Sequence, residues 1–183
     1  RLVDRGLLTR RRGVGTIVSP RHVHRPMELT SLMRDLVDAG HKVHTTIQRY
    51  EARPANAQEA DILKITEGTL IVHIERTRFA NDEPIAVLTN FIPTDIAPTM
   101  QELESASLYD LMRERGVTLA SARQVIGARS ATTKEAKLLS EHRGAALLTT
   151  QRTTYDPSGR IVEYGNHIYR ASRYSFEASL FAQ

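Results

Sequence analysis

The chain repeats part of its own sequence at an offset of 76 residues, and this repeat constrains the fold more than any other feature. Each copy predicts a short helix opened by a capping box, a glycine turn and then a β-hairpin. The hairpin turns are expected at residues 81–83 and 157–159. Two such units predict an antiparallel sheet with their helices on one face. The matching positions are Glu59 and Glu135, Ala60 and Ala136, Leu63 and Leu139, Gly68 and Gly144, Arg76 and Arg152, Thr77 and Thr153, and Ile85 and Ile161.

The segments outside the repeat add further helices and strands. A helix is expected to begin at Thr30 or its neighbour, to present Leu32, Leu36 and Val37 as an apolar stripe, and to end at Gly40. Together with the repeat, these segments predict an α+β fold, an antiparallel sheet with flanking helices. The expected elements are this helix at 31–39, a strand at 43–53, a helix at 108–115 capped by Ser107 and closed by Gly116, and a strand at 117–129.

The first 25 residues carry the basic excess of the chain. They hold seven arginines and one aspartate, whereas the remainder has slightly more acidic than basic residues. Contact with an anionic partner such as nucleic acid is therefore expected at the N-terminus. Residues 2–5 predict the end of a helix stopped by Gly6, and residues 7–18 predict a tight hairpin with an Arg- and Gly-rich turn. Residues 19–27 contain two prolines and no hydrophobic period, which predicts a linker.

Composition and motifs argue against several classes of function. The chain has no cysteine, so neither a disulfide nor a thiolate metal site is available. No apolar run approaches the roughly 20 residues of a membrane span. A secretory signal and the Gly-x-Ser-x-Gly, Walker and dinucleotide-binding motifs are missing, and neither His22 with His24 nor His41 with His44 forms a recognisable ligand set. We therefore expect a cytoplasmic protein without metal, cofactor or enzymatic activity, and the start without Met indicates a fragment of a longer chain.

Two arginines that stand two residues apart on an expected strand are the first candidates for a binding site. Because strand side chains alternate, Arg76 and Arg78 share a face with the apolar Val72 and Ile74. A guanidinium on an apolar face needs an anion, and its fork of donors fits phosphate or carboxylate. The alternative is that the apolar face ends early and that both arginines are solvated or salt-bridged.

Other polar residues occur where they could complete such a site. A carboxylate and a phenol on one face of the second repeat's last strand could bind hydroxyls or an amine, although an ordinary amphipathic strand gives the same pattern. Two helix starts could present N–H groups to an anion, although plain capping explains both. The residues concerned are Glu163 and Tyr169 on the strand, Thr30 and Ser31 at one helix start, and Ser107 and Tyr109 at the other.

Several short motifs occur in a fixed order and together resemble a known family. They are GLLTRRRGVGTIV at 6–18, LTS at 29–31, ERTRFA at 75–80, EPIA at 83–86, FIP at 91–93, SLYDL at 107–111, and YR at 169–170 with RYSF at 173–176. The first resembles the end of the winged helix-turn-helix of GntR-type bacterial transcription regulators. The others, over residues 26 to 181, resemble the UTRA effector-binding domain of the HutC subfamily.

The resemblance implies a fold similar to chorismate lyase and a cytoplasmic repressor, usually a homodimer. Its affinity for operator DNA would change when a small metabolite binds. The implied division is the end of the recognition helix and the wing at 1–18, a linker at 19–27 and the effector domain at 28–183. The wing residues expected to contact DNA are Arg10, Arg11, Arg12, Gly13, Gly15 and Thr16.

The resemblance also implies which residues bind the effector. In relatives that sense amino-sugar phosphates, the sugar meets a carboxylate and a tyrosine that match Glu163 and Tyr169. Leu88 departs from this pattern, because these sensors often carry a second Glu there. The effector is therefore expected to be a small anion, and a phosphosugar, a carboxylate and a phosphonate all stay open. The positions that match the phosphate-binding residues of those relatives are Arg76, Arg78, Thr30, Ser31, Ser107 and Tyr109.

Two other functions fit parts of the sequence. A lyase acting on an anionic aromatic acid would bind carboxylates with the arginines and use Glu163 as a general acid, but it has no use for a wing. A purely DNA-binding protein would use the N-terminal arginines, but the slightly acidic body argues against it. Without a complete recognition helix, the chain is not expected to read DNA sequence by itself.

Overall fold

The computed structural model describes residues 8–11, 15–18, 23–26 and 29–178. The helix end expected at residues 2–5 lies outside these ranges, as do Arg12 and Gly13 of the expected wing. The elements are β1 (Leu8–Arg11), β2 (Gly15–Val18), β3 (Val23–Pro26), α1 (Leu32–Asp38), β4 (Val43–Pro54), α2 (Ala57–Leu63), β5 (Leu70–Ala80), β6 (Glu83–Pro93), α3 (Met100–Ser105), α4 (Leu108–Glu114), β7 (Ser121–Ser130), α5 (Thr133–Leu138), β8 (Ala146–Tyr155), β9 (Ile161–Arg170) and β10 (Tyr174–Glu177).

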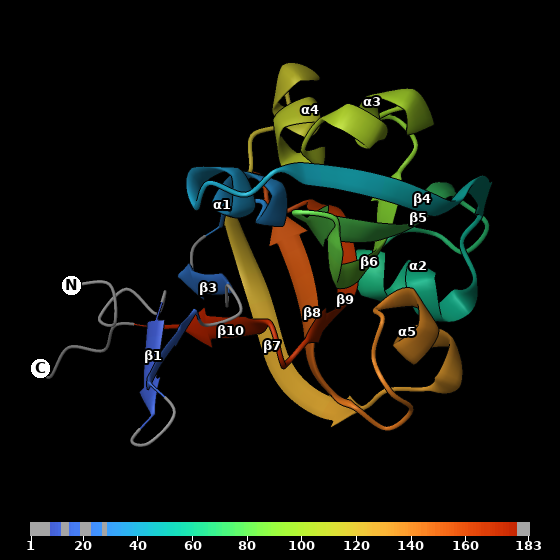
Figure 1. Ribbon diagram of the computed structural model, residues 1–183. Helices are drawn as coiled ribbons and strands as arrows, with labels where there is room; N and C mark the ends of the chain where they lie inside the picture. The colour runs from blue at the N-terminus through green and yellow to red at the C-terminus, as the bar shows by residue number, and fades with distance from the viewer. Residues whose placement is uncertain (1–7, 12–14, 19–22, 27–28, 179–183) are drawn as a thin grey trace, which may run out of the picture.

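A six-stranded antiparallel sheet forms the body of the molecule (Figure 1). Its strand order is β4-β5-β6-β9-β8-β7, so the two hairpins of the repeat lie side by side at its centre. Across the middle of the sheet, Asn90 on β6 and Arg152 on β8 both pair with Gly165 on β9. The α+β fold expected from the sequence, with an antiparallel sheet and flanking helices, is confirmed.

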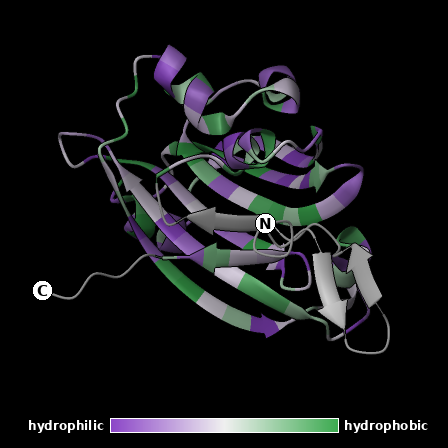
Figure 2. Ribbon diagram, turned by 60° about the vertical axis from the view of Figure 1, so that its left-hand side comes forward, coloured by the Kyte–Doolittle hydropathy of each residue, from purple (hydrophilic) through white to green (hydrophobic). Residues whose placement is uncertain are grey.

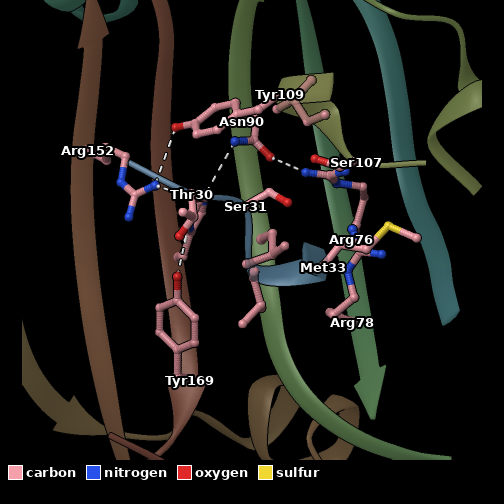
Figure 3. A pocket seen from close by; sticks show the side chains of 14 residues that line it. Thr30, Ser31, Met33, Arg76, Arg78, Asn90, Ser107, Tyr109, Arg152 and Tyr169 are labelled. Carbon is pink, nitrogen blue, oxygen red and sulfur yellow. Dashed lines mark hydrogen bonds between the residues drawn. The ribbon is translucent and has the colours of Figure 1, made fainter. Parts of the chain in front are cut away.

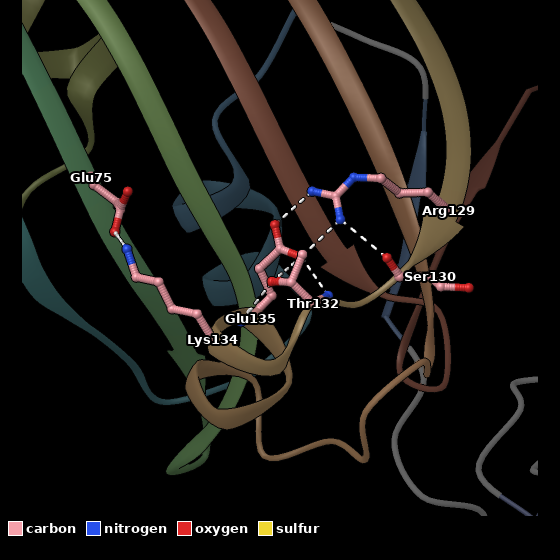
Figure 4. A network of polar contacts seen from close by, with 6 residues as sticks. All are labelled: Glu75, Arg129, Ser130, Thr132, Lys134 and Glu135. Atoms are coloured by element: carbon pink, nitrogen blue, oxygen red, sulfur yellow. Dashed lines mark hydrogen bonds and ion pairs between the residues drawn. The ribbon is translucent and has the colours of Figure 1, made fainter.

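The repeat is confirmed in local structure as well. Both helices open with a complete capping box, in which the side chains of Asn56 and Thr132 accept from the backbone of Glu59 and Glu135. The structure extends the repeat by one position that the sequence comparison left out. Arg53 forms an ion pair with Glu59, and Arg129, which is 76 residues later, forms the same pair with Glu135 (Figure 4).

Helices cover both faces of the sheet. The repeat helices α2 and α5 pack on one face, where Leu63 and Leu139 are buried. Helices α1, α3 and α4 pack on the opposite face, which carries Ile74, Leu88 and Ile92. Polar and apolar residues follow one another along the strands (Figure 2), as expected for strands that bury apolar side chains beside a polar site. None of the helices in the described ranges is long and apolar enough to cross a membrane.

Several expected details of the helices and strands are wrong. Val37 is 52% exposed, because α1 has only two turns and reaches the sheet with Leu32 and Leu36. The strand expected from residue 117 begins at Ser121, because the apolar Val117 packs against α4 from a loop. Helix α3 was not expected, although its capping box of Thr99 and Glu102 is present in the sequence.

The expected linker also contains structure. Strand β3 lies within it and pairs in parallel with β10, so that Val23 stands opposite Tyr174. Pro26 is at the end of the strand, a position where a missing N–H is tolerated. The hairpin of β1 and β2, expected at residues 7–18, is present with Arg10 opposite Thr16.

Candidate functional site

A pocket lies between the sheet and the first residues of α1 and α4 (Figure 3). Strands β5, β6, β8 and β9 supply part of its lining, and the starts of α1 and α4 supply the rest. The structure brings seven of the eight sequence-predicted effector residues into this lining: Thr30, Ser31, Arg76, Arg78, Ser107, Tyr109 and Tyr169.

Arg76 is almost completely buried in this pocket and is only partly hydrogen-bonded. It is 2% exposed, and its Nη2 donates to Asn90 Oδ1 at 2.9 Å. Its Nε and Nη1 have no partner among the described residues. Burial lowers the pKa of Arg76 to about 10, although the nearby Glu163 carboxylate opposes the shift. The guanidinium is therefore charged at neutral pH, and two of its donor nitrogens are unused among the described residues.

Arg78 stands two residues further along β5 in a similar environment. It is also 2% exposed; its Nη1 donates to Thr45 Oγ1, and its Nε has no partner in the described part of the chain. Burial, followed by repulsion from Arg76, lowers the pKa of Arg78 to about 9. Two cations that repel each other in a desolvated wall form a site that favours an anion.

Arg152 is a third buried arginine in the pocket, and the sequence reasoning missed it. It is 6% exposed and donates from Nε to Gln124 Oε1 at 2.7 Å, and from Nη1 to Tyr109 Oη at 3.4 Å. The repeat offered the signal, because it aligns Arg152 with Arg76. The other pocket residues that the prediction left out include Met33, Leu88, Asn90 and His167.

The three arginines of the pocket differ from the other buried arginine in their ion pairing. Among the described residues four arginines are buried, and the three in the pocket form no salt bridge with any described carboxylate. The fourth, Arg170, lies outside the pocket and pairs with Glu141 at 3.0 Å. Since a buried charge is costly unless it is paired, this pocket favours an anionic ligand.

Asn90 connects the two sides of the site. Its Oδ1 accepts from Arg76, which has donors only, so its Nδ2 must face the other way. Nδ2 lies 2.6 Å from Glu163 Oε1 and 3.2 Å from His167 Nε2. His167 therefore accepts at Nε2, carries its proton on Nδ1 and donates to Tyr169 Oη at 3.2 Å. This leaves the hydroxyl hydrogen of Tyr169 available as a donor.

Glu163 does not line the pocket, in contrast to its expected role as a contact for the effector. It is completely buried behind the lining, where it accepts from Asn90 at 2.6 Å, from Thr154 Oγ1 at 2.7 Å and from Tyr109 Oη at 3.2 Å. Burial raises the pKa of Glu163, and these hydrogen bonds together with Arg152 oppose that shift. Burial and then Glu163 raise the pKa of Tyr109 to about 12, so this phenol stays neutral. Glu163 thus positions Asn90 and Tyr109, which line the pocket.

The two helix starts differ in how their serines are used. Ser31 Oγ accepts from the backbone N–H of Arg34 at 3.2 Å and so caps α1. Ser107 occupies the N-cap position of α4, but its side chain makes no capping hydrogen bond, so the expected cap is wrong. Its buried Oγ has no partner among the described residues and lines the pocket. Its hydroxyl is available to a ligand.

Replacing Ser107 by alanine is therefore expected to leave the stability of the ligand-free domain unchanged within about 0.5 kcal/mol, because no cap is lost. The matched change Thr132→Ala removes a cap that exists and should cost about 1 kcal/mol. Urea unfolding of both variants measures the difference. Equal losses in the two variants would show that Ser107 caps α4 in solution.

In residues 29–178, where side chains are described, no cluster of three or more His, Asp and Glu side chains is arranged to hold a metal ion. The pocket lining supplies hydrogen-bond donors and positive charge, which suit an anion with oxygen acceptors.

Comparisons with known proteins agree with this architecture. Residues 38–175 match the UTRA domain model. The chain is 33% identical over 178 residues to the HTH-type transcriptional repressor NagR of Bacillus subtilis, covering 96% of this chain and 73% of NagR. The solved structure of a transcriptional regulator from Streptomyces coelicolor is 46% identical and covers 78% of this chain and 96% of its own, with a TM-score of 0.71. PhnF from Mycobacterium smegmatis, at 23% identity, covers 100% of this chain and 81% of its own with a TM-score of 0.89, which shows a shared fold.

Proposed function

Because the chain belongs to the UTRA domain family of GntR-type transcriptional repressors, HutC subfamily, we propose that its pocket binds a small anionic metabolite that alters DNA binding by the full-length regulator. One observation carries this proposal: Arg76, Arg78 and Arg152 are buried in one pocket without an ion pair among the described residues. An anion would compensate their desolvation, and bidentate contacts with guanidinium groups would orient it. The chain is a regulator and not an enzyme, so the lyase alternative is not supported.

The proposed roles of the other residues follow from their positions. Ser107 Oγ and the unused donors of Arg76 and Arg78 would hold the anion. The start of α1, with Thr30 and Ser31, would close over it from the opposite side (Figure 3). Of the remaining predicted site residues, Tyr109 and Tyr169 would donate hydrogen bonds from their hydroxyl groups. Glu163 would act from behind the lining, where it positions Asn90 and Tyr109.

A physical connection from the pocket toward the DNA-binding part supports a role in regulation. Tyr169 lines the pocket and stacks on Tyr174 of β10, with ring centroids 4.4 Å apart. Strand β10 pairs with β3, which follows the β1–β2 hairpin in the chain. An effector that shifts Tyr169 or α1 would change the stability of the contacts that join the pocket to β10 and β3. The expected change is the free energy typical of allosteric coupling, about 1–3 kcal/mol.

The remaining features of the regulator are also proposals. The division at residues 1–18, 19–27 and 28–183 would separate wing, connection and effector domain, with β3 docking the connection onto β10. The wing residues Arg10, Arg11, Gly15 and Thr16 lie in or beside the β1–β2 hairpin and would contact operator DNA in the full-length protein. The regulator would act in the cytoplasm as a homodimer.

The experiment is a thermal-shift screen of phosphorylated, phosphonylated and carboxylated metabolites. An anion at about 100 times its dissociation constant should stabilise the domain by about 2.7 kcal/mol, which shifts the unfolding temperature by several degrees. In Arg76→Ala, the shift should disappear while cooperative unfolding persists. An unchanged shift and an unchanged affinity in calorimetry would refute the pocket as the effector site. Calorimetry on the positive compounds then distinguishes the phosphosugar, carboxylate and phosphonate classes.

A further inference from the structure

The three unpaired arginines occupy two walls of the pocket. Arg76 and Arg78 project from β5, and Arg152 projects from β8 (Figure 3). Strands β6 and β9 lie between them. Three strand spacings separate the backbones of β5 and β8 by about 14 Å. Because the repeat aligns Arg76 with Arg152, the same type of side chain approaches the pocket from both hairpins.

The side chains between these walls keep the two cationic groups apart. From Arg152 the hydrogen bonds pass to Tyr109, then to Glu163, then to Asn90 and finally to Arg76. These intervening groups are packed and buried. The guanidinium groups of Arg76 and Arg152 are therefore two separate ends of one lining.

Arg152 is oriented by neutral groups. Gln124 Oε1 accepts from its Nε at 2.7 Å, and the Thr30 carbonyl and the Tyr109 hydroxyl lie 3.5 and 3.4 Å from its Nη1. Its Nη2 donates to no described residue. Glu163 is completely buried behind the lining, where it accepts from Asn90, Tyr109 and Thr154, and it makes no salt bridge with Arg152. Glu163 acts on Arg152 only through space, so one anion bound at Arg76 and Arg78 would leave Arg152 without an ion-pair partner among the described residues.

Building on the proposed anion site, we propose that the effector carries two anionic groups separated by a short linker. One group is held by Arg76 and Arg78, and the second is held by Arg152. Between the two ends, β6 and β9 present the apolar Leu88 together with Asn90, His167 and Tyr169, so the linker can carry both hydrocarbon and hydrogen-bonding groups. The chemical class is therefore a small phosphocarboxylate, phosphonocarboxylate or dicarboxylate.

Matched pairs of non-hydrolysable phosphonates test this second contact by calorimetry. Each pair differs only by a terminal carboxylate: phosphonoacetate against ethylphosphonate, 3-phosphonopropionate against propylphosphonate, and 4-phosphonobutyrate against butylphosphonate. At least one carboxylated member should bind the unmodified domain about tenfold or more tightly than its partner. In Arg152→Gln this preference should vanish, while the affinity for alkylphosphonates should stay within about threefold. Arg129→Gln, which changes an arginine outside the pocket, should retain the preference.

The outcomes separate this inference from the proposed function. If both members of every pair bind the unmodified domain with equal affinity, the second anionic group is wrong and the anion site at Arg76 and Arg78 stands. If the preference exists but persists in Arg152→Gln, another residue holds the carboxylate and the assignment of Arg152 is overturned. If no phosphonate binds while Arg76→Ala still responds to a metabolite from the screen, both proposals fail.

Discussion

Replacing Arg78 by methionine is expected to stabilise the ligand-free domain and to remove most of its affinity for anions. The stability gain follows from the environment of the guanidinium, whose pKa falls to about 9 because of burial and of Arg76. Methionine fills a similar space without the desolvation and the repulsion. Replacing buried ionic groups by apolar ones of similar volume stabilises proteins by about 1–4 kcal/mol. Among the described residues, the only hydrogen bond lost is the one to Thr45, whose side chain is partly exposed.

The loss of affinity has a separate cause. A hydrogen bond between a charged donor and an anion contributes about 1.5–3 kcal/mol, so removing Arg78 should weaken anion binding by about 10- to 100-fold. Stability and binding thus change in opposite directions, as expected for a residue kept for function at the expense of stability. Urea unfolding without ligand and calorimetry with propylphosphonate, both at pH 7, measure the two effects.

Arg170→Met is the matched control, because Arg170 is buried to a similar degree but paired with Glu141. This change leaves a carboxylate without its partner and should destabilise the domain by about 3–5 kcal/mol, without altering affinity. A comparable loss of stability in Arg78→Met would contradict the assignment of Arg78 as an unpaired cation, whatever the effect on binding.

The sequence predicted the framework because each repeat contains its own local signals. Capping boxes, glycine turns and alternating strands act over a few residues, and they were sufficient to define α2, α5 and the two hairpins. The pair Arg76 and Arg78 was found for the same reason, because two arginines on an apolar strand face stand out locally. The repeat aligns Arg152 with Arg76 and could have identified it, but the residues next to Arg152 on its strand did not indicate a binding site.

The remaining part of the site depends on contacts between distant segments. Asn90, Glu163 and His167 meet only because β6 pairs with β9 in one particular register. No spacing within either strand indicates that Glu163 lies behind the lining and not in it. The cap expected of Ser107 was wrong for a related reason: a serine before a helix predicts a cap, whereas the packing of α4 on the sheet leaves its hydroxyl in the pocket. Tertiary packing overrode the local preference in this case.

Both the pairing of β9 with β6 and β8 and the geometry of the pocket depend on Gly165. It lies opposite both Asn90 and Arg152. A Cβ at this position would come within 2.6 Å of Glu163 Oε1 and 2.6 Å of His167 Nε2. Neither group can move freely, because Asn90 Nδ2 bonds both and His167 also bonds Tyr169. Any side chain would therefore break the hydrogen bonds that join the two halves of the site.

Gly165→Ala is thus expected to destabilise the domain by about 2 kcal/mol or more, from overpacking together with lost buried hydrogen bonds. For a domain of this size the unfolding temperature should fall by about 4–8 °C. Affinity for propylphosphonate should fall as well, since Asn90 no longer holds Arg76. Gly127→Ala on the edge strand β7 is the control, because its Cβ would approach only the Thr149 hydroxyl, at 3.0 Å, and that side chain can rotate. If Gly165→Ala matched Gly127→Ala in stability and in affinity, the hydrogen bonds of Asn90 would not be what organises the pocket.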